Sequence, residues 1–225
     1  MVAIFVAVTI IVFLTIDYFI QKVAKHKQSA TPAEASAVRF LLPRGLFFGK
    51  GHTWIELLPS GNVRIGVDDF VQKLIGKIDE IRPIPPGDSV KRGDEVFSIR
   101  QGNKTLTFRS PISGTILSIN SELTKSPAFL KHDPYREGWI AVIEPKSLPE
   151  EIQIMTIGDH AAKWLKEEIR RFRSFITEGV SNEQYPELAM AGKTLMDGGV
   201  PINGALEHIS KELWEGFEKE FLQQE

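Results

Sequence analysis

The segment 97–108 limits most narrowly what this chain can fold into. When its halves are paired about Gly102-Asn103, Phe97 lies opposite Phe108 and Ile99 opposite Leu106. In the same register the polar residues pair with one another: Ser98 with Thr107, Arg100 with Thr105, and Gln101 with Lys104 beside the turn. Cross-strand pairing needs such a separation of apolar from polar partners, and both turn residues tolerate positive φ. The segment is therefore predicted to be a β-hairpin.

Short strands and turns extend through residues 39–147. Gly61-Asn62 separates the runs TWIELLP and VRIGV, which indicates another hairpin. The run DDFVQKLIG predicts one short helix, with Asp68 or Asp69 as its N-cap and Gly76 at its end. Many short strands joined by regular turns are typical of a compact sandwich or barrel.

Ordered short motifs run from residue 43 to residue 139. Pro43, Leu46, Phe48, His52 and Trp54 fit the pattern P-x-x-L-x-[YF]-x-x-x-H-x-W without gaps. Further motifs follow in order: Gly66 to Gly76, Gly87 to Phe97, Ser110-Pro111-Ile112-Ser113-Gly114 with Asn120, and Pro127 to Trp139. In this order they resemble the glycine cleavage system H protein family. The resemblance implies a mainly β fold, a lipoyl/biotinyl-type barrel-sandwich hybrid.

The resemblance also implies a carrier residue, Lys104. In the family, a lysine at a hairpin tip within E-S-V-K-A carries lipoate, which is a group carrier. This sequence has Gln101-Gly102-Asn103-Lys104-Thr105 there. When the family motif is aligned forward from Glu95, Lys104 falls at the carrier position. When it is aligned backward from Pro111, Lys104 lies one residue away from that position. Two interpretations stay open: lipoate on Lys104, or a solvated lysine beside a turn in a domain that has lost the modification.

The run Val2–Ile20 is apolar except for Asp17. As a helix it would span about 28 Å, close to a bilayer core of about 30 Å. A signal peptide is the alternative, but the run is long for one and no cationic side chain precedes it. Lysines follow it, so the positive-inside rule favours a cytoplasmic C-terminal side. We expect a single-pass anchor in the cytoplasmic membrane, with residues 2–20 in the bilayer and the bulk of the chain facing the cytoplasm.

Residues 148–225 have a helical period. Apolar residues recur at three- and four-residue steps over 157–178, which predicts an amphipathic helix. A shorter helix is expected within 182–195. Another is expected after Asn203, with its apolar stripe at Leu206, Ile209, Leu213, Phe217 and Phe221. These stripes are expected to pack on one another and on the β domain, and their aromatic residues to offer a docking face for a partner.

The composition excludes several classes of function. Lys plus Arg total 27 and Asp plus Glu 29, so a net charge of −2 provides no general basic field for nucleic acid. The chain has no cysteine, which rules out a cysteine nucleophile and thiolate metal sites. The 5 histidines are scattered, and His52 is interpreted as a fold element rather than a ligand. We expect no catalytic residues and no metal.

The sequence thus predicts a fold of an N-terminal transmembrane helix, an H-protein-like β domain and a C-terminal helical extension. The expected boundaries are 1–21 for the anchor, 22–38 for a linker, 39–147 for the β domain and 148–225 for the extension. The predicted function is a non-enzymatic, membrane-anchored adaptor or accessory subunit with protein partners in a membrane-associated complex. The alternative is a lipoyl-group carrier, with lipoate on Lys104, that shuttles an intermediate between enzymes.

Overall fold

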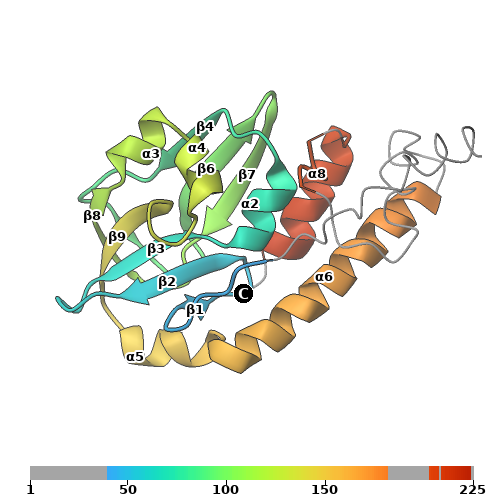
Figure 1. The fold of residues 1–225 in the computed structure, drawn as a ribbon. Coiled ribbons are helices and arrows are strands. Elements are labelled where there is room, and N and C mark those ends of the chain that lie inside the picture. Colours follow the sequence, from blue (N-terminus) through green and yellow to red (C-terminus); the bar gives the residue numbers. More distant parts are fainter. Residues whose placement is uncertain (1–39, 182–202, 208, 224–225) are drawn as a thin grey trace, which may run out of the picture. The chain divides into compact units, whose positions relative to one another are not determined.

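A computed structural model describes residues 40–181, 203–207 and 209–223 of this protein. Its described strands form two antiparallel sheets, one of six strands in the order β1-β2-β3-β9-β8-β5 and one of three in the order β4-β6-β7 (Figure 1). The strands are β1 (Phe47–Phe48), β2 (Thr53–Leu57), β3 (Val63–Val67), β4 (Glu80–Pro83), β5 (Ser89–Val90), β6 (Glu95–Gln101), β7 (Lys104–Arg109), β8 (Gly114–Ile119) and β9 (Trp139–Pro145).

Helices connect and flank the sheets. They are α2 (Asp69–Ile75), α3 (Ser121–Lys125), α4 (Ala128–His132), α5 (Leu148–Glu151), the 3₁₀ turn η1 (Ile152–Ile154), α6 (Gly158–Ser181), α8 (Lys211–Phe217) and the π-helical turn η2 (Glu218–Leu222). The predicted short helix is confirmed as α2, with the Asp68 carboxylate accepting the Val71 N–H and Gly76 at its end with φ of 77°. Only glycine adopts that conformation readily, so Gly76 ends the helix without strain.

The predicted hairpin is β6–β7, and its register is confirmed. Phe97 pairs with Phe108, Ile99 with Leu106, and Gln101 with Lys104. The two phenylalanine rings stack with centroids 4.6 Å apart. Because β7 is the outer strand of its sheet, one row of its backbone groups has no strand partner.

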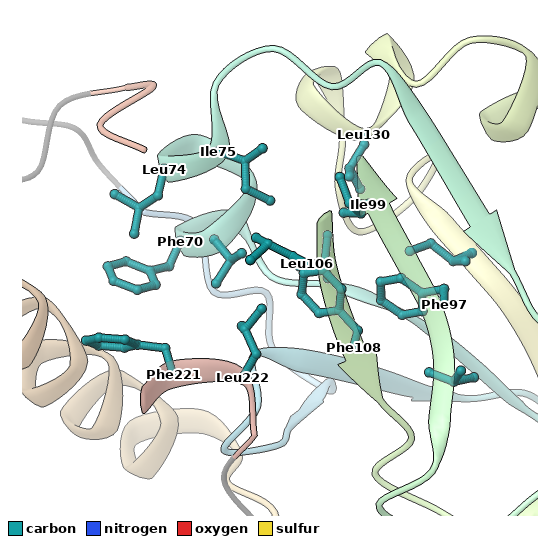
Figure 2. Close-up of a cluster of buried hydrophobic side chains, with 14 of the residues drawn as sticks. Phe70, Leu74, Ile75, Phe97, Ile99, Leu106, Phe108, Leu130, Phe221 and Leu222 are labelled. Carbon is teal, nitrogen blue, oxygen red and sulfur yellow. The ribbon is translucent and has the colours of Figure 1, made fainter. Parts of the chain in front are cut away.

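One core fills the space between the sheets. Ile55 and Ile65 come from the six-stranded sheet and Phe97 and Phe108 from the three-stranded one, and all four are fully buried. Figure 2 shows Phe221 and Leu222 pointing into the same cluster as Phe70 and Phe108. The C-terminal residues therefore complete the core of the sandwich.

Residues 203–207 and 209–223, here called the C-terminal segment, lie beside α2 and β7 (Figure 1). The expected helix after Asn203 begins only at Lys211, where the Ser210 hydroxyl accepts the Leu213 N–H. Gly204 has φ of 77°, which is not helical, and the Gly204 and Leu206 N–H groups donate to carbonyls at the end of α2. The predicted helix over 157–178 is confirmed as α6, whereas the one expected within 182–195 lies outside the described residues.

The predicted fold class needs one correction. A mainly β sandwich with C-terminal helices is present, but the N-terminal transmembrane helix is not supported. Across residues 40–181, 203–207 and 209–223, no helix has both the length and the apolar character needed to cross a bilayer. The segment 1–21 itself lies outside the described residues. The boundaries at 21, 38 and 147 stay predictions.

Candidate functional site

Lys104 is the first residue of β7 and lies beside the hairpin turn rather than at its apex. The turn is made by Gly102, with φ of 58°, and Asn103. Across from Lys104, the Gln101 amide donates to the carbonyls of Ile75 and Lys77 at 2.8 and 2.6 Å. This end of the hairpin is therefore tied to the end of α2.

The Lys104 ammonium is enclosed by the C-terminal segment. Its Nζ atom donates to the carbonyl oxygens of Leu206, Glu207 and Ile209, at 3.4, 3.1 and 3.1 Å. It also lies 4.7 Å from the ring centroid of Trp214, within range for a cation–π interaction. Only 9% of the residue is exposed. The candidate carrier lysine is thus buried, and the interpretation of it as a solvated lysine is wrong.

Burial changes the acid–base behaviour of this amine. Loss of solvation lowers the pKa of Lys104, and the Glu207 carboxylate partly offsets that effect. A lowered pKa raises the fraction of the neutral amine, which is the form that reacts with acyl donors. The three carbonyls nevertheless accept the N–H groups of the charged form.

The outer edge of β7 is covered by side chains of the same segment. The Trp214 Nε1–H donates to the Thr105 carbonyl at 2.9 Å, and the Thr107 N–H donates to the Glu218 carboxylate at 2.9 Å. Both backbone groups lie on the side of β7 opposite β6, which is the side where a further strand could pair. The C-terminal segment therefore satisfies the free edge of the hairpin that carries Lys104.

A second buried cation lies at His52. Its Nδ1 atom is 2.7 Å from Asp68 and its Nε2 atom 3.5 Å from Glu168, while Arg171 binds Glu168. Burial by itself would lower the pKa of His52, but the two carboxylates outweigh it and raise that pKa to about 9. His52 therefore carries a charge at neutral pH and joins the β domain to α6. This contact agrees with its interpretation as a fold element.

The chain resembles known proteins over its β domain. The family model for the glycine cleavage H-protein matches residues 46–168, which is more than half of the chain. The chain belongs to the glycine cleavage H-protein family. The matched range includes Lys104 and ends within α6, so the C-terminal segment that encloses Lys104 lies beyond it.

Individual relatives agree with this family assignment. A probable glycine cleavage system H protein of Pyrococcus furiosus is 32% identical over 127 residues, covering 56% of this chain and 94% of that protein. Glycine cleavage system H protein 2 of Aquifex aeolicus is 35% identical over 132 residues, covering 58% and 82%. The crystal structure of an H protein from Mycobacterium marinum superposes with a TM-score of 0.50 at 21% identity, covering 56% and 99%, and supports the fold.

The expected location in the cytoplasmic membrane is corrected by these findings. The relatives are glycine cleavage H proteins, and the described part of the chain contains no helix able to cross a membrane. The expected bilayer contact through residues 2–20 falls outside the described residues. Within the described residues, no group of three or more His, Asp or Glu side chains is placed to hold a metal ion.

Sequence reasoning found Lys104 but missed what surrounds it. One signal was available in the hairpin register, because residues two apart on a strand share a face. Lys104 is therefore on the face of Leu106 and Phe108, which is buried. The acceptors themselves are backbone carbonyls about a hundred residues later in the chain, and no side-chain pattern marks them.

Proposed function

We propose that this H-protein family member is a lipoyl-group carrier with Lys104 as the attachment residue. The observation that supports the proposal most directly is the position of Lys104 within the family match, on a two-stranded hairpin at the edge of the sandwich. The family resemblance implies that a lysine on this hairpin presents lipoate. When bound, the group would supply a dithiol that holds and releases an intermediate, which this cysteine-free chain cannot supply itself.

The residues present fit this role in part. Lys104 supplies a primary amine whose pKa is lowered by burial, as attachment through an amide requires a neutral amine. Three carbonyls and Trp214 now contact Nζ, however, and a long arm attached there would have to displace them. A carrier function therefore requires the C-terminal segment to move away from Nζ.

The proposed role needs no catalytic residue in this chain. A carrier presents its group to other enzymes, and those enzymes perform the chemistry. The relatives are named as proteins of the glycine cleavage system. We propose partners of the corresponding kind, namely enzymes that load and unload a lipoyl arm.

Intact mass spectrometry tests the attachment. The full chain is co-expressed with a lipoate ligase in medium containing lipoate, and its mass is compared with that of the chain made without the ligase. We expect the mass of one lipoyl group to be added and to map to Lys104. Lys104→Arg should abolish the addition, while the matched control Lys131→Arg should retain it. An unmodified chain, in cells where another H protein is fully lipoylated, would refute the carrier function.

The enclosure of Lys104 favours a second candidate function. A lysine whose three N–H groups are all bound within the chain can serve as a structural cation. On that basis the chain would be an unmodified H-protein-like accessory module that binds partners without carrying a group. The same mass measurement separates the candidates, because an accessory module stays unmodified in cells where another H protein is fully lipoylated.

A further inference from the structure

The acceptors around Lys104 match one chemical form of its side chain. A lysine ammonium has three N–H donors and no acceptor. The Leu206, Glu207 and Ile209 carbonyls provide three acceptors, and the Trp214 ring faces the charge. The C-terminal segment is therefore a binding site, within the same chain, for an unmodified lysine.

An acylated lysine cannot occupy this site. Acylation replaces the ammonium with an amide nitrogen that has a single N–H and no charge. At least two of the three carbonyls would lose their donor, and the Trp214 ring would lose its cation. Lys104 is only 9% exposed, so an acyl chain on Nζ would have to displace atoms that now cover the amine. The enclosed arrangement and a modified Lys104 are thus mutually exclusive.

Beyond its contacts with Lys104 and α2, the C-terminal segment has a separate apolar attachment to the domain. Phe217, Phe221 and Leu222 are fully buried, and Phe221 contacts Phe172 and Phe175 of α6. These contacts do not involve Lys104. We call residues 203–207 and 209–214 the clamp and residues 217–222 the apolar base.

We propose that the clamp binds Lys104 only while its amine is free and opens when that amine is acylated, while the apolar base (residues 217–222) stays in place. The clamp would then report the modification state of the carrier lysine. Its opening would also uncover the Thr105 carbonyl at the edge of β7, where a partner enzyme could approach the hairpin. The link to a lipoyl arm rests on the proposed function, whereas the clamp itself rests on the contacts above.

Hydrogen exchange of the full-length chain tests the clamp without any lipoylation. Lys104→Gln removes the charge and approximates an acylated lysine, while Lys104→Arg keeps the charge. In Lys104→Gln we expect the clamp amides, including those of Gly204 and Leu206, to exchange at least about tenfold faster than in the wild type. Residues 217–222 should exchange at the wild-type rate in both variants. A folded Lys104→Gln variant whose clamp amides exchange within twofold of wild type would overturn the proposal.

Acylation of the wild-type chain gives a second measurement that does not depend on a variant folding. The N-hydroxysuccinimide ester of acetate transfers its acetyl group to a neutral amine, forming an amide and releasing N-hydroxysuccinimide, while the lysine proton goes to solvent. We expect Lys104 to react at least about tenfold more slowly than Lys125, whose side chain is 71% exposed. Chains acetylated at Lys104 should show the fast clamp exchange of Lys104→Gln.

The two measurements separate this proposal from the carrier function. Equal reaction rates at Lys104 and Lys125, or an acetylated Lys104 with a protected clamp, would refute the clamp whatever the lipoylation result. The chain could also stay unlipoylated yet show slow acetylation of Lys104 and fast clamp exchange in Lys104→Gln. That outcome would support the clamp and refute the carrier function.

Discussion

Two buried cations join the C-terminal helices to the β sandwich, and they are stabilised in different ways. His52 lies between the carboxylates of Asp68 and Glu168, so its charge is balanced by opposite charges. Lys104 lies among three neutral carbonyls and the ring of Trp214, so its charge is stabilised by neutral groups rather than by a contacting carboxylate.

The difference indicates which contact can change during function. A charge-balanced group becomes costly to bury as soon as either partner is altered, because an unpaired charge is left behind. A cation held by carbonyls leaves only neutral groups behind when it is removed. The His52 contact is therefore suited to a permanent connection, and the Lys104 contact to one that chemical modification releases.

Removing the His52 charge should have the largest effect. His52 has φ of 60°, and asparagine tolerates this conformation, so His52→Asn removes the charge with little backbone strain. We expect the free energy of unfolding to fall by about 3–5 kcal/mol, as when one partner of a buried ion pair is lost. Denaturant titration measures it, with Lys163→Ala on the exposed face of α6 as the control. If the free energy of unfolding fell by less than about 1 kcal/mol, burial of the two carboxylates would not depend on the His52 charge.

The pH dependence of stability should reveal the same cation in the unaltered chain. The folded pKa of His52 is about 9 and its usual value 6.5. Because folding raises this pKa, the stabilisation is complete below pH 6.5 and is lost as the pH rises through 9. The loss should be on the order of 3 kcal/mol. Denaturant titrations between pH 6 and 10 should show the decline in the wild type, and a similar decline in His52→Asn would argue against this assignment.

The sequence was sufficient where local chemistry decides the structure. Alternation fixed the pairing of Phe97 with Phe108, and the capping residues Asp68 and Gly76 fixed α2. Both results depend on residues that belong to one hairpin or one short helix. The family resemblance also held, because many weak motifs in one order are jointly specific.

Contacts between distant residues were beyond the same reasoning. The helical stripe after Asn203 correctly indicated buried residues at Leu206 and Phe221, but not the surface that buries them. The start of α8 was misplaced because Gly204 has a non-helical φ of 77° and Ser210 is the residue that caps the helix, and the helical period records neither. The enclosure of Lys104 by carbonyls could not be predicted, since every residue type has a carbonyl.

Removing the Lys104 charge should lower the free energy of unfolding by less than removing the His52 charge. Lys104→Met keeps most of the side-chain length but leaves three partly or fully buried carbonyls without their donor. We expect the free energy of unfolding to fall by about 2 kcal/mol. Lys125→Met, at an exposed lysine, is the control and should change it by less than about 0.5 kcal/mol. If Lys104→Met proved as costly as His52→Asn, the distinction between a permanent and a releasable cation would fail.

The smallest effect is expected at the start of α8, where the segment can be weakened without touching either cation. The Ser210 hydroxyl accepts the Leu213 N–H as an N-cap, whereas Ser147 occupies the same position before α5 and makes no such bond. Ser210→Ala should lower the free energy of unfolding by about 1 kcal/mol, and Ser147→Ala should leave it nearly unchanged. Hydrogen exchange should place the Ser210→Ala effect in residues 211–217. An equal effect of both substitutions would mean that the cap does not stabilise α8.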